Sequence, residues 1–139
     1  MGCAVRNPNV LTYGTYDLLH FGHMRLLRRA KKLGGRLIVG LSTDGFNAIK
    51  GKKAHETYQS RRSKLLQTGL VDFVFPEENW AQKAQDIQRL DAGIFVMGDD
   101  WAGKFDELQA YCDVVYLSRT PGISSTLLRS HLAESRIAV

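Results

Sequence analysis

A chain of 139 residues with 44% hydrophobic and 24% charged residues has the size of one domain and the composition of a globular protein, which excludes disordered and collagen-like chains. The net charge of +5 favours anionic partners such as nucleotides, sugar phosphates or nucleic acid. We expect a cytoplasmic protein, because the sequence has no apolar stretch of membrane-spanning length, no signal-peptide pattern, and only two cysteines, Cys3 and Cys112, which form no metal or disulfide motif.

The first predicted element is a strand over residues 10–14, which is an apolar run. The tetrad His20-Phe21-Gly22-His23 follows it and leads into an amphipathic helix expected over residues 24–33, with its basic side chains on a solvated face. Two imidazoles at the start of a helix, with a glycine beside the second, suit the phosphates of a nucleotide. A zinc site is the weaker alternative, because the sequence offers no evident third ligand.

The second strand is expected over residues 37–42. The segment that follows, residues 43–59, is predicted to be a long polar loop, and it contains Lys50, Lys52 and Lys53. Long connections at the carboxyl ends of parallel strands are where such folds bind their ligands. Taken by themselves, these lysines are typical of solvated surface.

The second half of the chain continues the alternation of strands and helices. Ser60 is predicted to cap a helix that runs to about residue 68, and Asn79 with Gln82 resembles a capping box for a helix over residues 80–90. Ser124 begins the last expected helix, and further strands are predicted over residues 71–75, 94–98 and 114–117. The pattern predicts a Rossmann-like α/β fold, a doubly wound parallel sheet of about five strands in a single domain over residues 10–139, with residues 1–9 as an N-terminal extension.

The stretch T-Y-G-T-Y-D-L-L-H-F-G-H, residues 12–23, resembles the cytidylyltransferase branch of the nucleotidylyltransferase superfamily, whose signature is H-x-G-H after a first strand. Three more stretches, N-W-x-Q-K at 79–83, F-V-M-G-D-D-W at 95–101 and R-T-P-G-I-S-S-T at 119–126, are similar to the glycerol-3-phosphate cytidylyltransferases. The resemblance implies an enzyme that joins CTP to an alcohol phosphate by direct in-line attack. With sn-glycerol 3-phosphate the products are pyrophosphate and CDP-glycerol, a precursor for teichoic acid or capsule.

The resemblance also implies roles for individual residues. His20, His23 and Lys52 would be the catalytic residues, which stabilise charge on the α-phosphoryl group, and Lys50 and Lys83 would bind the acceptor phosphate. The implied nucleotide-binding residues belong to the first turn, to the lysine segment and to the stretch before the last helix: Gly14, Thr15, Tyr16, His20, Phe21, Gly22, His23, Lys52, Arg119, Thr120, Gly122, Ile123, Ser124, Ser125 and Thr126.

Three carboxylates, Asp17, Asp99 and Asp100, are candidates for structural hydrogen bonds, for nucleotide contacts or for a Mg²⁺ ion bound mainly through the CTP phosphates. Relatives form homodimers, and the resemblance implies neither nucleic-acid binding nor membrane insertion. Gly69 stands where relatives carry an arginine, so that cation is missing or is replaced by Arg61 or Arg62.

Two alternative functions remain open at this point. The first is the same cytidylyl transfer to another phosphate acceptor, such as ethanolamine phosphate, ribitol phosphate or a capsule precursor. The second belongs to a different class and is a non-catalytic protein that binds nucleotides or nucleic acid through its basic surface.

Overall fold

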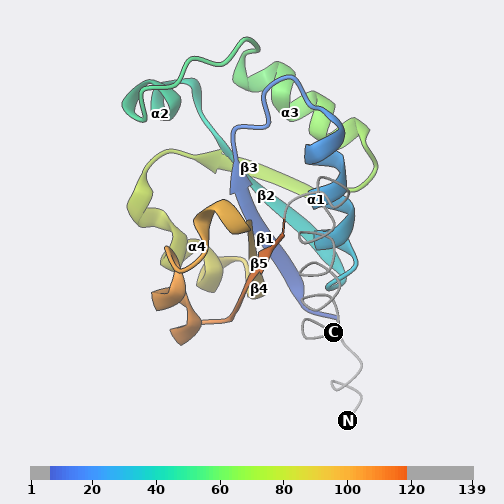
Figure 1. The fold of residues 1–139 in the computed structure, drawn as a ribbon, viewed down its shortest axis with the longest axis vertical. Coiled ribbons are helices and arrows are strands. Elements are labelled where there is room, and N and C mark those ends of the chain that lie inside the picture. Colours follow the sequence, from blue (N-terminus) through green and yellow to red (C-terminus); the bar gives the residue numbers. More distant parts are fainter. Residues whose placement is uncertain (1–6, 119–139) are drawn as a thin grey trace, which may run out of the picture.

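Five parallel strands form one sheet at the centre of the structure, a computed structural model that describes residues 7–118 of the chain (Figure 1). Their spatial order is β3-β2-β1-β4-β5, and every neighbouring pair is parallel. The strands are β1 (Asn9–Gly14), β2 (Arg36–Ser42), β3 (Phe73–Glu77), β4 (Ala92–Gly98) and β5 (Asp113–Leu117). The order reverses between β1 and β4, and open α/β sheets bind ligands beyond the carboxyl ends of the strands at such a switch point. The predicted fold class is confirmed.

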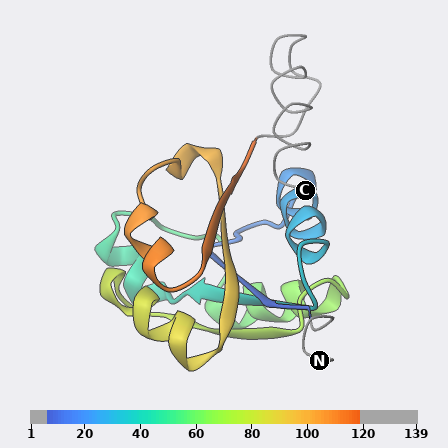
Figure 2. The same cartoon turned by 90° about the horizontal axis from the view of Figure 1, so that it is seen from below.

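Helices cover both faces of the sheet, as the two views in Figures 1 and 2 show. Helices α1 and α3 cover one face, α4 and the 3₁₀ segment η4 cover the other, and the short α2 lies beyond the carboxyl end of β2. The bounds are α1 (Phe21–Lys31), α2 (Asp44–Ile49), α3 (Tyr58–Gln67), α4 (Lys83–Arg89), and the 3₁₀ segments η2 (Trp80–Gln82), η3 (Asp99–Trp101) and η4 (Asp106–Ala110). Within residues 7–118 we find no helix that is long and apolar enough to cross a membrane.

The alternation of side chains along β1 divides the core into two clusters. Val10 packs with Leu27 of α1 and Leu65 of α3, whereas Leu11 faces the opposite side and packs with Ile87 of α4. All five of these aliphatic side chains are buried. A strand that is apolar on both faces is typical of a parallel sheet with helices on either side, which is why the strands could be predicted from short continuous apolar runs.

Two predicted boundaries differ from the structure for identifiable reasons. Helix α1 begins at Phe21, three residues before the expected start, because His20 is its N-cap and the tetrad itself forms the first turn. Strand β3 pairs with β2 from Phe73 to Glu77 and not over 71–75. Val71 is buried ahead of the strand, and Glu77 is a buried charge at its end, so the apolar run and the hydrogen-bonded ladder do not coincide.

The polar segment 43–59 is not an unbroken loop, because it contains α2, whose first turn is capped by the hydroxyl of Thr43. The prediction that Ser60 caps α3 is also wrong. The N–H of Ser60 donates to Oγ1 of Thr57 at 3.2 Å, so Thr57 is the N-cap. The predicted capping box of Asn79 and Gln82 is present, although it opens a 3₁₀ turn before α4. The helix expected near Ser124 lies outside the described residues.

Candidate active site

Two adjoining pockets open at the carboxyl edge of the sheet beside the β1/β4 switch point. The first, here called the lysine pocket, is lined by Tyr13, Gly14, Thr15, Lys50, Lys52, Glu77, Trp80, Lys83, Met97, Trp101 and Phe105. The second, the histidine pocket, is lined by His20, Gly22, Arg25, Leu26, Arg29, Gly98, Asp99, Asp100, Leu117 and Ser118. Met97 and Gly98 are consecutive residues of β4, one in each lining, so the two pockets adjoin at this strand end.

The two histidines of the tetrad use the same ring nitrogen to cap α1. Nδ1 of His20 accepts the N–H of Gly22 at 3.1 Å, and Nδ1 of His23 accepts the N–H of His20 at 3.2 Å. Because each Nδ1 is an acceptor, each neutral imidazole carries its hydrogen on Nε2 and offers it as a donor. Burial, together with the neighbouring His20, lowers the pKa of His23 to about 4, so His23 is neutral near pH 7. This arrangement offers two N–H donors to an anion at a helix N-terminus.

The rings beside the two glycines of this turn leave little room for a side chain. A Cβ on Gly14 would lie 2.7 Å from the ring of Tyr16, and a Cβ on Gly22 would lie 3.1 Å from Cε1 of His20. Tyr16 is buried, and its ring packs on that of His23 with centroids 5.2 Å apart. Tyr16 therefore supports the turn from within the core, whereas Phe21 is 65% exposed beside the histidines.

Lys50 and Lys83 lie in the lysine pocket and are joined by a chain of hydrogen bonds. Nζ of Lys83 donates to Oε2 of Glu77 at 2.8 Å, Oγ of Ser42 donates to Oε1 of Glu77 at 2.8 Å, and Nζ of Lys50 donates to Oγ of Ser42 at 2.9 Å. Lys83 is only 4% exposed, although a lysine is usually solvated. The predicted pair of acceptor lysines is thus brought together from the C-cap of α2 and the first residue of α4.

Aromatic rings form the walls around these ammonium groups. Nζ of Lys83 lies 4.6 Å from the ring centroid of Tyr13, 5.4 Å from that of Trp80 and 5.3 Å from that of Phe105. Nζ of Lys50 lies 5.8 Å from the Trp80 ring. Ring faces attract cations and also exclude water, which strengthens the field of the lysines in the pocket.

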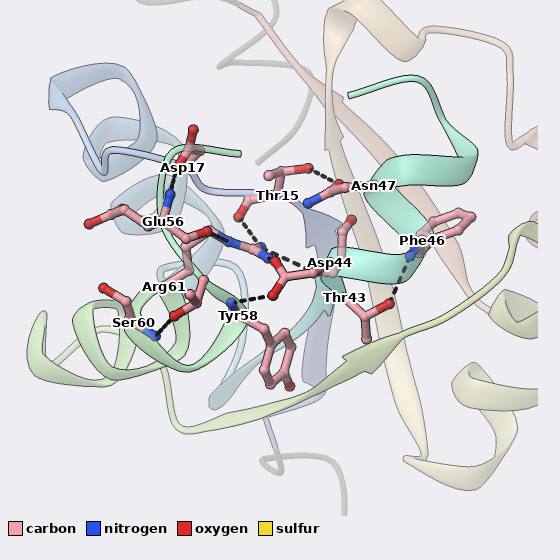
Figure 3. Close-up of polar contacts among 12 residues, drawn as sticks. Thr15, Asp17, Thr43, Asp44, Phe46, Asn47, Glu56, Tyr58, Ser60 and Arg61 are labelled. Atoms are coloured by element: carbon pink, nitrogen blue, oxygen red, sulfur yellow. Dashed lines mark hydrogen bonds and ion pairs between the residues drawn. The ribbon is translucent and has the colours of Figure 1, made fainter. Parts of the chain in front are cut away.

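Arg61 connects the segments that carry the site, as Figure 3 shows. Its side chain is fully buried, and its guanidinium donates to the carbonyl oxygens of Thr15 (2.9 Å), Ser42 (2.8 Å) and Glu56 (3.0 Å) and to Oδ1 of Asp44 (2.7 Å). These partners belong to the turn after β1, the end of β2, the segment before α3 and the start of α2. Arg61 is therefore committed to structural hydrogen bonds and does not replace the arginine that the resemblance leads us to expect at position 69.

Gly69 lies at the opposite edge of the sheet from the site. It follows the C-cap of α3, three residues before Asp72, whose N–H donates to the carbonyl of Leu37 near the start of β2. The site lies at the other end of β2, at Ser42, which is five residues and roughly 17 Å along the strand. Gly69 has a φ of +77°, a conformation that suits glycine, and a Cβ there would meet open space.

Asp17 is held by backbone donors. Its oxygens accept the N–H of His55 at 2.8 Å and the N–H of Glu56 at 3.0 Å, and the hydrogen bond from the His55 backbone is the first cause of a lowered pKa for Asp17. This carboxylate therefore ties the segment before α3 to the turn before α1 (Figure 3). Asp99 and Asp100 begin η3 and line the histidine pocket.

Residues 7–118 contain no cluster of three or more histidine, cysteine, aspartate or glutamate side chains that suits a metal ion. Asp99 and Asp100 are the predicted carboxylates that line the histidine pocket, where a Mg²⁺ ion bound through nucleotide phosphates would find carboxylate oxygens. This donor set fits a metal that arrives with phosphates.

The remaining predicted residues are placed as follows. Thr15 lines the lysine pocket, and its hydroxyl donates to Oδ1 of the buried Asn47 at 3.0 Å. Lys52 is exposed at the mouth of the same pocket. The predicted phosphate-binding stretch lies outside the described residues, and it comprises Arg119, Thr120, Gly122, Ile123, Ser124, Ser125 and Thr126.

Sequence reasoning missed Glu77, Ser42 and the anchoring role of Arg61. Glu77 and Ser42 end their strands as polar residues, and a polar residue at the end of a buried strand is the signal that could have singled them out. Nothing in the sequence distinguishes the buried Arg61 from the exposed Arg62 beside it.

Comparison with known proteins gives consistent matches. The family described as Cytidylyltransferase-like matches residues 11–131. A glycerol-3-phosphate cytidylyltransferase of Bacillus spizizenii is 57% identical over 124 residues, which are 89% of this chain and 96% of that protein. A glycerol-3-phosphate cytidylyltransferase of Staphylococcus aureus is 53% identical over 88% of this chain and 93% of its own length.

Among solved structures, the lipopolysaccharide core biosynthesis protein of Thermoplasma volcanium superposes with a TM-score of 0.68 at 22% identity, covering 82% of this chain and 98% of that one. A pantothenate synthetase of Thermus thermophilus superposes with a TM-score of 0.56 at 14% identity, covering 94% of this chain and 67% of the other. At these identities the likeness shows the fold.

Proposed function

Since this chain belongs to the cytidylyltransferase-like family, we propose that it transfers the cytidylyl group of CTP to a small alcohol phosphate, with sn-glycerol 3-phosphate as the acceptor. The products are then CDP-glycerol and pyrophosphate. The names of the relatives that are 53–57% identical over most of their length support this acceptor.

The observation that carries the proposal is the meeting of two anion-binding pockets at one strand end. His20 lines the histidine pocket and, with His23 stacked against it, offers N–H donors to the triphosphate. The lysine pocket offers Lys50 and Lys83 to a second phosphate, and Lys52 to the nucleotide. A transfer between two phosphates needs both anions side by side, and the positive charge of the lysines offsets their repulsion.

The mechanism is a direct displacement at the α-phosphorus of CTP. An oxygen of the acceptor phosphate forms the new P–O bond while the bond to the leaving pyrophosphate breaks, so the reaction needs no enzyme nucleophile. His20 and His23 donate hydrogen bonds to the α-phosphoryl oxygens as charge develops there, with Lys52 from the adjoining pocket. Catalysis then rests on positioning and on electrostatic stabilisation of the transition state.

Lys50 and Lys83 bind the phosphate of the acceptor in this mechanism. The Lys83 ammonium, which lies among three rings, is held in one place and loses little freedom when the acceptor binds. Trp80 is exposed, its ring centroid lies within 6 Å of both ammonium groups, and it would cover the bound polyol.

We include three further features in the proposal. A Mg²⁺ ion bound mainly through the CTP phosphates would neutralise charge on the leaving pyrophosphate. The enzyme would be a cytoplasmic homodimer, which the family resemblance supports, and its CDP-glycerol would be used for teichoic acid or capsule synthesis. Sedimentation of the purified chain tests the dimer, and turnover with and without a chelator tests the metal.

Pyrophosphate release tests the reaction itself. The purified enzyme is assayed with CTP or ATP against sn-glycerol 3-phosphate, ribitol phosphate and ethanolamine phosphate. The expected result is turnover with CTP and sn-glycerol 3-phosphate at the highest kcat/KM. Turnover only with another acceptor would show that sn-glycerol 3-phosphate is not the substrate. Salt-sensitive binding of duplex DNA without turnover would show that the protein binds nucleic acid and is not a cytidylyltransferase.

A further inference from the structure

Glu77 is a buried carboxylate in the middle of a pocket that is otherwise basic. It is 3% exposed and is the acidic side chain in the lining described for the lysine pocket, beside Lys50, Lys52 and Lys83. Burying an ionised carboxylate is costly unless opposite charges and hydrogen bonds compensate for the lost water. In a pocket meant for anions, a carboxylate also reduces the net attraction, so its presence requires a reason.

Its contacts give that reason, because one carboxylate holds both acceptor lysines. Oε2 accepts directly from Nζ of Lys83, at 2.8 Å. Oε1 accepts the hydroxyl hydrogen of Ser42 at 2.8 Å, and the hydroxyl has no second hydrogen to donate. Ser42 can meet Lys50 only with an oxygen lone pair, and Nζ of Lys50 donates to that oxygen at 2.9 Å. Glu77 therefore orients the hydroxyl that receives Lys50.

The lysines need such a clamp because they repel each other. Both ammonium groups lie within 6 Å of the Trp80 ring centroid, at 5.8 Å for Lys50 and 5.4 Å for Lys83. Each ammonium sits on a flexible four-carbon stem, which water would otherwise draw out of the pocket. A fixed counter-charge between them keeps both stems in place before the acceptor arrives.

We propose that Glu77 is the positioning residue of the acceptor site, which holds Lys50 and Lys83 in the geometry that receives the phosphate of the acceptor. The inference rests on the proposed function, because it takes the two lysines as the acceptor ligands. Glu77 contacts Lys83 directly and Lys50 through Ser42, so it acts through the two lysines and not on the reacting atoms. Its effect therefore belongs to acceptor binding and not to the chemical step at CTP.

The electrostatics of Lys50 supply a readout that a purely structural residue would not move. Burial lowers the pKa of Lys50, the charge of Glu77 on β3 opposes this, and Lys52, Lys83 on α4 and Arg61 on α3 lower the pKa further. Removing the Glu77 charge therefore lowers the pKa of Lys50. Loss of acceptor binding at alkaline pH should then begin at a lower pH than in the wild type.

The test uses Glu77→Gln, which keeps the size of the side chain and removes the charge, and Glu78→Gln as its matched control. Glu78 is the next residue, carries the same charge and is exposed. For E77Q we expect the KM for sn-glycerol 3-phosphate to be close to the wild-type value at about pH 7. The ratio of the two KM values should rise with pH and approach roughly tenfold once the pH exceeds the pKa of Lys50 in both proteins, as for a pKa lowered by about one unit. The KM for CTP stays within about twofold of the wild type in both variants.

A KM ratio that does not change with pH, or an equal rise in the KM for CTP, would overturn the positioning role. If E77Q does not fold, the second variant, Ser42→Ala, tests the positioning role instead. It removes the hydroxyl that links Lys50 to Glu77 and leaves the Glu77–Lys83 ion pair. We expect the same direction of pH dependence, and an unchanged profile in S42A would contradict the clamp.

NMR titration of lysine Cε signals in the ligand-free enzyme separates this inference from the proposed function. The Lys50 signal, assigned by its loss in Lys50→Arg, should titrate at lower pH in E77Q than in the wild type and E78Q. If the wild-type enzyme shows no turnover with any acceptor but this shift is present, the proposed function fails while the clamp stands. If turnover is normal and the shift is absent, the clamp fails alone.

Discussion

The imidazole rings of His20 and His23 stack with their centroids 3.8 Å apart and 21° between their planes. Nδ1 of each ring accepts a backbone N–H at the start of α1, so the two histidines cap the helix. They also supply the two N–H donors of the site. Loss of a histidine should therefore affect both stability and turnover, and suitable substitutions can separate the two effects.

His20→Asn should separate them. Asparagine is among the best N-cap residues and keeps an acceptor for the Gly22 N–H, but it has no donor in the place of Nε2. We expect kcat to fall by about 10² to 10³, as when one oxyanion donor is removed, while the thermal midpoint stays close to that of the wild type. His20→Ala should lose the same activity and also about 1 kcal/mol of stability. Near-normal turnover in a folded H20N enzyme would refute the role of the donor.

The lowered pKa of His23 predicts a pH dependence of stability. The folded-state value of about 4 lies below the ordinary value of 6.5, so between these values the unfolded chain binds more protons than the folded protein. The free energy of unfolding should therefore decrease as the pH falls from about 6.5 to about 4. Denaturant unfolding at several pH values measures this slope, which should be shallower in His23→Gln. An equal slope in both proteins would show that His23 is not its source.

Lys50→Ala and Lys83→Ala should both raise the KM for the acceptor phosphate more than the KM for CTP, but they should differ in stability. Lys83 and Glu77 are both nearly fully buried, and removing one partner of a buried ion pair costs about 3 kcal/mol or more. Lys50 is half-buried, so its loss should cost less. The double variant Lys83→Met with Glu77→Gln should regain much of the lost stability but none of the acceptor binding. Equal thermal midpoints for K50A and K83A would contradict the buried pair.

Arg61→Lys should loosen the turn after β1 and the segment before α3 together, because one ammonium cannot reach the four acceptors that the guanidinium contacts. We expect a loss of about 3 kcal/mol in unfolding free energy, as for other broken buried charge networks, and a raised KM for CTP. Arg62→Lys is the matched control, since Arg62 is the exposed neighbour and should show neither effect. A stable R61K enzyme with a normal KM for CTP would contradict the anchoring role.

The order of strands and helices, the doubly wound sheet and the position of the histidine turn followed from the sequence. Their signals are local: short apolar runs for strands buried on both faces, helical spacing of leucines, and the glycine within the tetrad. Local patterns failed at the starts of two helices. Ser60 has the chemistry of a cap, but the turn that reaches it begins at Thr57, and α2 formed where composition alone predicted a polar loop.

By itself, the sequence determined the fold class and the position of the histidine pair, because those features depend on residue type and spacing along the chain. The phosphate-binding role of the lysines came only from the resemblance to a family. Only the tertiary structure decided that Glu77 and Ser42 join Lys50 to Lys83, that Arg61 is buried while Arg62 is exposed, and that Gly69 lies far from the site. These relationships depend on strand register and on contacts between residues that are distant in the chain. Side chains that meet at the carboxyl edge of a parallel sheet come from separate strand–helix units, so the distances between them are set only when the sheet has formed.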